Sequence, residues 1–361
     1  MKLSKNINKI WLGYFVTKIF YMFFALFFYQ KFIYNPTRGI GDLDLYLKGQ
    51  MNDGLYLILT DPTILLEFIG KYLNMFLGPI LSNIPFLILS FYGVFYSVSK
   101  LQLSNSELLW VLFLLSFPTF GVYSSVIGKE AMCVFYFGII SGYLFDLINK
   151  NRIKPKLIEL LALYLLSITT PSFFIGIGSV FLFVIISNKF HLKGYGKLFL
   201  LASHILLAIF LFYIFRDILN DMSFDIDKYF RKNAGSTREN IFINNYDIFW
   251  KAPYGMFVAF WGPTFFEITQ KPIQSIAFIE SLIIFIFFLF FIMRFLAKAL
   301  KTSHFNIYVF ALTFMLVFWF LFAHYPSGIM NPGSALRYRV RFYGFLVVFL
   351  FFLYSKYIKK N

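Results

Sequence analysis

The sequence predicts an all-α integral membrane protein with about ten transmembrane helices and one large outer loop. Of its 361 residues, 59% are hydrophobic, 53 are Phe and only 14% are charged. A soluble chain of this length carries more charge than that. The apolar stretches reach roughly twenty residues, which as a helix crosses a hydrocarbon core of about 30 Å. They lack the alternation of polar and apolar residues that marks the strands of a membrane barrel.

Short clusters of Lys, Asn, Gly and Pro separate the apolar stretches. The predicted spans are 10–33, 72–98, 108–128, 130–148, 157–170, 172–187, 198–215, 273–296, 305–324 and 342–357. The first follows three lysines like a signal peptide but is too long and lacks a small-residue cleavage site, so we expect an uncleaved span. Between 157 and 187, Thr169-Thr170-Pro171 interrupts the run. We expect either two tilted short helices there or a re-entrant element.

The net charge of +16 is a second constraint. Basic proteins attract nucleic acids in general, but membrane topology explains the charge better. With the amino terminus in the cytoplasm, most basic clusters fall on the cytoplasmic side, as the positive-inside rule requires. They are Lys100, the 150–156 cluster, Lys189/Lys193/Lys197, Arg294/Lys298/Lys301 and Lys356/Lys359/Lys360. We therefore predict cytoplasmic termini and no nucleic-acid partner.

The chain has one cysteine, Cys133, inside an apolar run. It provides no disulfide framework and no cysteine-based metal site. The sequence also contains no phosphate-binding Walker loop, no dinucleotide-binding glycine fingerprint and no His-rich metal spacing. We predict neither a metal nor a cofactor.

We expect a single polytopic membrane domain, 1–361, with two large outer loops. The first, 34–71, contains Gly41-Asp42-Leu-Asp44 and an amphipathic stretch from Leu55 to Lys71 that is predicted to lie along the membrane interface. The second, 216–272, is long enough to form a lid or a small extramembrane subdomain.

Three arginines at spacing two, Arg337, Arg339 and Arg341, lie near the outer end of the last span. Membrane-edge charge is costly, so by default it indicates function. Pro332 and Gly333 favour a non-helical segment from His324 to Arg341, in which all three side chains would share one face. The planar guanidinium suits bidentate contacts to phosphate. The alternative is that these arginines snorkel to the membrane edge.

Lys129 and Glu130 follow Ser124-Ser125 at another outer turn. Either the pair only starts a helix, where Glu is stabilised by the helix dipole, or Lys129 holds a phosphate while Glu130 accepts a proton. Asp42 and His324 are further candidates for a catalytic base. A solvated loop is the alternative for Asp42.

The second loop carries more candidates. Arg231 and Arg238 could help to bind an anion. Trp250 and Trp261, with Glu267, resemble the aromatic and acidic side chains of carbohydrate sites, since sugar rings stack on indole faces. Tryptophan is also an ordinary anchor at the membrane interface.

The order of these motifs resembles that of the Wzy-type polymerases of O-antigen and capsular polysaccharides, which are polytopic, GT-C-like membrane glycosyltransferases. The resemblance comprises Gly41-Asp42 after the first span, Ser124-Ser125-x-x-Gly-Lys-Glu130, Arg231-x-x-x-Gly-Ser, Gly262-Pro-x-x-x-Glu267 and Asn331-x-Gly-x-x-x-Arg-x-Arg339. It covers most of the chain, through short motifs.

The resemblance implies a bacterial inner-membrane enzyme that moves a growing glycan from undecaprenyl diphosphate to a lipid-linked oligosaccharide repeat unit on the periplasmic face. Arginines 337, 339 and 341, with Lys129, Arg231 and Arg238, would stabilise the diphosphate. Glu130 or His324 would act as the base. A chain-length regulator is a further expected partner. Alternatives are an O-antigen ligase, a polyprenyl-phosphate-sugar transferase with Asp42 as the base, and a lipid-linked oligosaccharide flippase.

Overall fold

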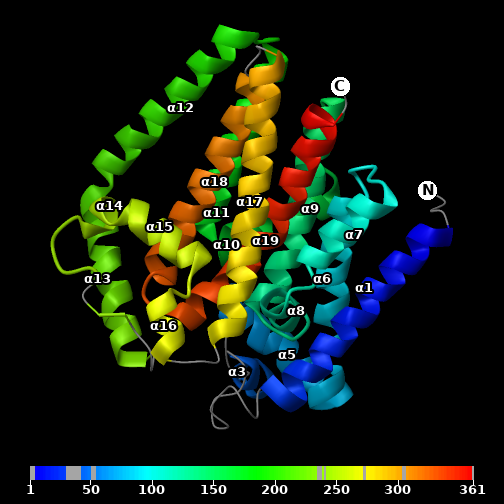
Figure 1. The fold of residues 1–361 in the computed structure, drawn as a ribbon. Coiled ribbons are helices and arrows are strands. Elements are labelled where there is room, and N and C mark those ends of the chain that lie inside the picture. The colour runs from blue at the N-terminus through cyan, green and yellow to red at the C-terminus, as the bar shows by residue number, and fades with distance from the viewer. Residues whose placement is uncertain are drawn as a thin grey trace. The chain divides into compact units, whose positions relative to one another are not determined.

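The computed structural model describes residues 5–29, 42–49, 54–233, 238–239, 241–270, 274–302 and 306–359. Within these ranges the regular structure is helical and contains no strand, which confirms the all-α prediction (Figure 1). Among the described residues, seven helices are long and apolar enough to cross a membrane: Ile7–Tyr29, Pro62–Leu81, Lys129–Lys150, Pro171–Lys189, Gly194–Ile214, Ser275–Lys298 and Ile307–Gly328. The protein is therefore an α-helical multi-pass membrane protein. Ten spans are not confirmed, because three further apolar helices have only 10–17 residues.

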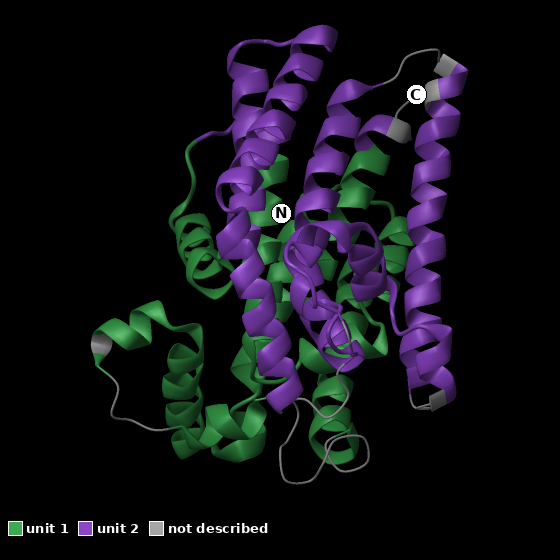
Figure 2. Ribbon diagram, turned by 90° about the vertical axis from the view of Figure 1, so that its left-hand side faces the viewer, with its two compact units in different colours: residues 1–146, 154–171, 340–355 green, residues 147–153, 172–339, 356–361 purple. Residues whose placement is uncertain are grey.

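The contacts divide the chain into two compact units (Figure 2). Unit 1 comprises residues 1–146, 154–171 and 340–355, and unit 2 comprises residues 147–153, 172–339 and 356–361. Unit 1 contains α1 (Lys5–Phe24), a π-helical turn (Ala25–Tyr29), α3 (Leu43–Lys48), α4 (Leu55–Thr60), α5 (Pro62–Leu81), α6 (Ile84–Val98), α7 (Asn105–Leu114), α8 (Pro118–Tyr123), most of α9 (Lys129–Lys150), α10 (Leu157–Thr169) and the C-terminal part of α19 (Pro332–Leu353).

Unit 2 contains α11 (Pro171–Lys189) from its second residue, α12 (Gly194–Ile214), α13 (Arg216–Asn233), α14 (Asp247–Trp250), α15 (Ala252–Trp261), α16 (Phe265–Gln270), α17 (Ser275–Thr302), α18 (Ile307–Gly328) and the first residues of α19. A second π-helical turn, Tyr354–Ile358, follows α19. Residues 342–357, predicted as the tenth span, fall in α19 and this turn.

Helix α9 is the most buried of the seven candidate spans, with 94% of its most apolar window buried. It crosses α6 at a contact between two glycines: a Cβ on Gly138 would lie 2.2 Å from the carbonyl oxygen of Gly93. Backbones approach this closely only where neither residue has a side chain, as in many packed membrane helices. Helix α12 is the opposite case, with only 6% of its window buried. The apolar surface that α12 exposes is compatible with contact to lipid.

The predicted span 72–98 is divided between α5 and α6. Gly78 has a φ of 76°, and Pro79 follows it, so the helix kinks there. The helix begins at Pro62, earlier than predicted, because Asp61 is an N-cap that accepts hydrogen bonds from the backbone NH groups of Thr63 and Ile64. The expected interfacial stretch 55–71 accordingly forms α4 and the start of α5. Residues 30–33 of the first predicted span, and residues 34–41 and 50–53 of the first predicted loop, Gly41 among them, lie outside the described residues.

The predicted span 108–128 is interrupted as well. Helix α7 ends at Leu114, and α8 begins at Pro118, where proline occupies the first helical position. The break expected near Thr169-Thr170-Pro171 is confirmed, since α10 ends at Thr169 and α11 begins at Pro171.

The second predicted loop, 216–272, folds largely into the four helices α13 to α16. Helix α15 packs against α18 and α17. Its buried side is apolar and consists of Ala252, Gly255, Val258, Ala259 and Phe260. This segment is therefore part of the packed core of unit 2. Residues 234–237, 240 and 271–273 lie outside the described residues.

Candidate functional site

The expected extended segment from His324 to Arg341 is wrong. Helix α18 continues to Gly328, and α19 begins at Pro332. Asn331 caps α19, since its Oδ1 accepts hydrogen bonds from the NH groups of Gly333 at 2.8 Å and Ser334 at 3.1 Å. Proline is favoured at the first helical position because the NH group it lacks has no partner there. Pro332 therefore starts a helix here and does not prevent one.

The helix separates the three arginines. Each step of two residues turns an α-helix by about 200°. Arg339 thus takes the face of α19 opposite to Arg337 and Arg341, and the predicted clamp of three arginines on one face is wrong as well. Arg337 is half-buried, with its guanidinium 5.9 Å from the centre of the Tyr338 ring.

Unit 1 brings Glu130 and Arg341 into a buried ion pair. Glu130, the second residue of α9, is only 3% exposed. Its Oε1 accepts hydrogen bonds from Arg341 Nη2 at 3.0 Å and Nε at 3.3 Å. Lys129 and Glu130 are the first two residues of α9, which both interpretations of the pair require, and Glu130 therefore also lies at the positive end of the α9 dipole.

Lys129 has a different environment. It is half-buried, and its Nζ donates to Thr63 Oγ1 at 2.6 Å. Among the described residues, no carboxylate forms an ion pair with this ammonium. The hydroxyl partner is neutral, so this hydrogen bond does not cancel the positive charge of Lys129.

Two aspartates lie within electrostatic reach of Lys129, namely Asp42 and Asp61. Asp42 is half-buried and precedes α3, and its Oδ2 accepts from the Tyr46 hydroxyl at 3.3 Å. Partial burial alone would raise the pKa of Asp61, but hydrogen bonds from the backbone NH groups of Thr63 and Ile64 hold it below the usual value. We call Asp42, Asp61, Lys129, Glu130 and Arg341 the α9 charge cluster. It combines carboxylates that can take a proton with cations that can hold an anion.

The segment before α9 is irregular and entirely buried. Residues 124–128, which we call the Ser124–Gly128 turn, are non-helical and fully enclosed. The Ser125 hydroxyl is buried and has no hydrogen-bond partner there. A buried unpaired hydroxyl costs free energy, so the turn has capacity for one further hydrogen bond.

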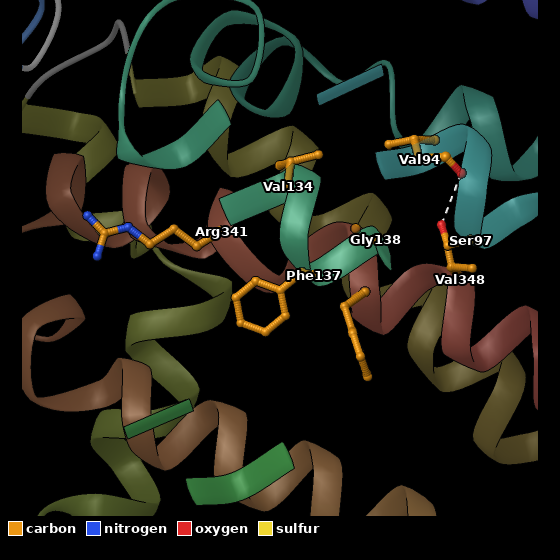
Figure 3. Close-up of a pocket in the computed structure, with 9 residues that line it drawn as sticks. Val94, Ser97, Val134, Phe137, Gly138, Arg341 and Val348 are labelled. Atoms are coloured by element: carbon orange, nitrogen blue, oxygen red, sulfur yellow. Dashed lines mark hydrogen bonds between the residues drawn. The ribbon is translucent and has the colours of Figure 1, made fainter. Parts of the chain in front are cut away.

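A small cavity of about 10 Å³ adjoins Arg341. It has room for about one water molecule. Figure 3 shows the Arg341 guanidinium pointing away from the other lining residues, and Ser97 Oγ donating to the Val94 carbonyl at 3.0 Å. The cavity is therefore lined by the aliphatic part of Arg341 and is no substrate site.

In unit 2, His324 and Arg339 close the C-terminal end of α15. His324 is 3% exposed, and its Nε2 donates to the carbonyl oxygen of Ala259 at 3.0 Å. Arg339 is 2% exposed, and its Nη1 donates to the carbonyl oxygen of Phe260 and to Ser281 Oγ, both at 2.8 Å. The last carbonyls of a helix lack partners within it. These contacts give His324 and Arg339 a structural role.

Arg238 closes the end of α18 in the same way. Its Nη1 donates to Ile329 O at 2.7 Å, and its backbone NH donates to Met330 O at 2.7 Å. The other side of the guanidinium forms a bidentate pair with Glu267, with Nε to Oε1 at 2.6 Å and Nη2 to Oε2 at 2.9 Å. Burial alone would raise the pKa of Glu267, but the hydrogen bonds from Arg238 and the Thr264 backbone NH hold it below the usual value.

The remaining candidates of the second loop are scattered over unit 2. Arg231 is exposed and pairs with Asp227 one turn before it, with Nε 2.5 Å from Oδ2. Trp261 is half-buried and packs edge-on against Phe260, Phe285 and Phe288, and its indole NH has no hydrogen-bond partner in the described part of the chain. Trp250 is 82% exposed and retains an open indole face. The structure thus gathers Asp42, Lys129, Glu130 and Arg341 in unit 1, and it does not gather the predicted unit 2 residues into one cluster.

Among the described residues, no group of three or more His, Cys, Asp or Glu side chains is placed to hold a metal ion. The chain matches no family model, and no curated protein or solved structure is significantly similar to it.

Sequence reasoning missed Lys18 and Asp61. Lys18 lies in the first span and is 2% exposed, and a charge within an apolar span is a signal for a site. Asp61 followed by Pro62 is a helix-start signal. Ser90 and Asn83 also reach the Ser124–Gly128 turn, but nothing in the sequence distinguishes them from other buried polar residues.

Proposed function

We propose that the protein is a membrane glycosyltransferase of the polysaccharide polymerase type. It moves a growing glycan from undecaprenyl diphosphate to the terminal sugar of a lipid-linked repeat unit on the periplasmic face. The observation that carries the proposal is the α9 charge cluster, in which Lys129, without a carboxylate partner among the described residues, lies beside the buried Glu130–Arg341 pair. In a membrane protein, charge buried at the end of an apolar helix is costly and is a default indication of a functional site.

The reaction needs an anion site and a base. The bond between the anomeric carbon and the diphosphate oxygen breaks, the acceptor hydroxyl oxygen attacks that carbon, and its proton passes to a carboxylate. Lys129 and Arg341 supply positive charge for the departing diphosphate. Removing one such group costs about 10²-fold in turnover.

Two carboxylates of the α9 charge cluster, Asp42 and Glu130, belong to the motifs named in the sequence analysis. We assign the role of the base to Asp42. Glu130 Oε1 already accepts two hydrogen bonds from the Arg341 guanidinium. Its role is then to hold Arg341 in place. His324 is excluded from the proposal because its ring is buried and donates to a helix carbonyl in unit 2.

The test is the glycan profile of a strain that lacks this gene. The proposal predicts loss of the polymer ladder with retention of one repeat unit on the lipid. A plasmid carrying the wild-type gene restores the ladder, whereas Lys129→Ala and Asp42→Asn do not, although both proteins are present in the membrane. An unaltered ladder in the deletion strain would contradict the proposal.

The placement of Asp42 also favours a second candidate, a transferase that adds single sugars from a polyprenyl phosphate donor. An acidic residue after the first span is the expected base of such an enzyme, and Asp42 lies within electrostatic reach of Lys129. The length of the product separates the two. A single addition by the purified protein supports this second candidate, and repeated addition supports the polymerase.

A further inference from the structure

The Ser124–Gly128 turn is held by side chains from three other parts of unit 1. Irregular backbone inside a membrane protein needs partners for its NH and carbonyl groups, because neither water nor a helix supplies them. Asn83, between α5 and α6, accepts from the NH group of Ile127 at 2.8 Å. The Ser90 hydroxyl of α6 donates to the carbonyl oxygen of Ser124 at 2.5 Å. Together they fix both ends of the turn.

The third side chain is Lys18 of α1. Its Nζ donates to Ser124 O at 3.0 Å and to Ser124 Oγ at 2.7 Å, and it lies 5.7 Å from the centre of the Phe120 ring. Ser124 Oγ in turn donates to the carbonyl oxygen of Phe120 at 2.5 Å. A buried lysine side chain is costly unless it is hydrogen-bonded. Both hydrogen bonds of Lys18 end on Ser124, whereas Ser90 donates to the carbonyl groups of Ser124 and Leu87.

The turn leads directly into the reactive residues. Gly128 is its last residue, and Lys129 and Glu130 follow as the first residues of α9. The position of Ser124 therefore determines where α9 starts. It thereby also sets the hydrogen bond from Lys129 to Thr63 and the ion pair between Glu130 and Arg341. A displacement of about 1 Å remote from the reacting atoms can cost about 10²-fold in rate.

We propose that Lys18 is a positioning residue, which acts through the Ser124–Gly128 turn to place Lys129 and Glu130 for the transfer reaction. The part of this inference that concerns turnover rests on the proposed function. Lys18 contacts the turn and not the substrate, so it affects turnover and leaves substrate capture nearly unchanged.

The kinetic test compares Lys18→Met with Lys9→Met in the full-length protein in liposomes that contain the lipid-linked repeat. Lys9 lies on the same helix with an exposed side chain, so it is a matched control. Lys18→Met is expected to lower kcat roughly 10- to 100-fold with KM changed less than about twofold. Lys9→Met should behave as the wild type does. A kcat for Lys18→Met within twofold of wild type would overturn the inference.

A second pair of variants serves if Lys18→Met does not fold. Ser90 and Ser97 are buried serines of α6, and each donates to the carbonyl three residues before it, but only Ser90 also reaches Ser124 O. Ser90→Ala should lower kcat, whereas Ser97→Ala should not. Equal kcat values for the two variants would contradict the positioning role of the turn.

Hydrogen exchange measured by mass spectrometry separates this inference from the proposed function. Lys18→Met or Ser90→Ala should accelerate exchange in peptides that cover 120–128 and leave those of 135–146 unchanged, whether or not the protein transfers sugar. If the wild type lengthens no glycan but exchange in the turn still rises, the proposed function fails and the positioning role stands. Unchanged exchange in the turn would overturn the positioning role alone.

Discussion

At the level of single residues, the basic side chains of the predicted site have two kinds of environment. Arg238, Arg339 and His324 donate to carbonyl groups that end α18 and α15, where the helix lacks partners for its last carbonyls. Arg341 pairs with Glu130 at the start of α9, and Lys129 beside it donates to a hydroxyl. The anion site that we propose uses the second kind, Lys129 and Arg341.

The Glu130–Arg341 pair gives the first prediction. Arg341→Met should destabilise the protein by about 3–5 kcal/mol, because it leaves the Glu130 carboxylate buried without its partner. Thermal unfolding in detergent measures this. Adding Glu130→Gln to the Arg341→Met protein should recover much of the loss. A double variant as unstable as the sum of the two single variants would contradict the coupling.

The Arg238–Glu267 pair gives a prediction about pH. The pKa of Glu267 is lowered in the folded protein from its usual value of 4.5. The stabilisation is therefore complete above the pKa of the unfolded chain and is lost as the pH falls through the lower, folded pKa. Between neutral pH and about pH 3, the wild type should lose more thermal stability than Glu267→Gln. Equal losses would show that this pair does not contribute.

At the level of helices, the crossing of α6 and α9 depends on Gly93 and Gly138. A Cβ added at Gly138 would meet backbone that cannot rotate away. Gly178 of α11 has no atom within 4 Å of an added Cβ, which makes it a suitable control.

Gly138→Ala should destabilise the protein by roughly 1–3 kcal/mol, the range for overpacked sites. Gly178→Ala should be neutral or up to about 1 kcal/mol stabilising, since alanine favours the helix. Unfolding of both variants in the same detergent tests the difference. Equal stability of the two variants would mean that the helices do not cross as described.

Some of the helices can be predicted from the sequence, and others cannot. The apolar runs predicted α9, α11, α12, α17 and α18 because length and hydropathy suffice for buried or lipid-facing helices. Asn331-Pro332 is a helix-start signal, but Pro332 and Gly333 together are equally typical of a turn, so the sequence does not distinguish the two. The kink at Gly78 and the Glu130–Arg341 pair could not be predicted, because each depends on packing between segments distant in sequence.

At the level of the whole molecule, the distribution of basic residues predicts which face each loop occupies. Cys133 is the only cysteine and is buried, so introduced cysteines can be labelled with little background. Trp250→Cys should react with a membrane-impermeant maleimide in intact spheroplasts. Tyr195→Cys, at a position 89% exposed in the wild type, should react only after the membrane is permeabilised. The reverse pattern would contradict the predicted orientation.

The most direct test of the central claim is glycan lengthening by the purified protein in liposomes that hold only an undecaprenyl-diphosphate-linked repeat unit. The wild type should convert the single repeat into a ladder and release undecaprenyl diphosphate. Lys129→Ala should give about 10²-fold less product while it unfolds at the wild-type temperature. A wild-type protein that leaves the repeat unit unchanged, or a Lys129→Ala protein with full activity, would contradict the claim.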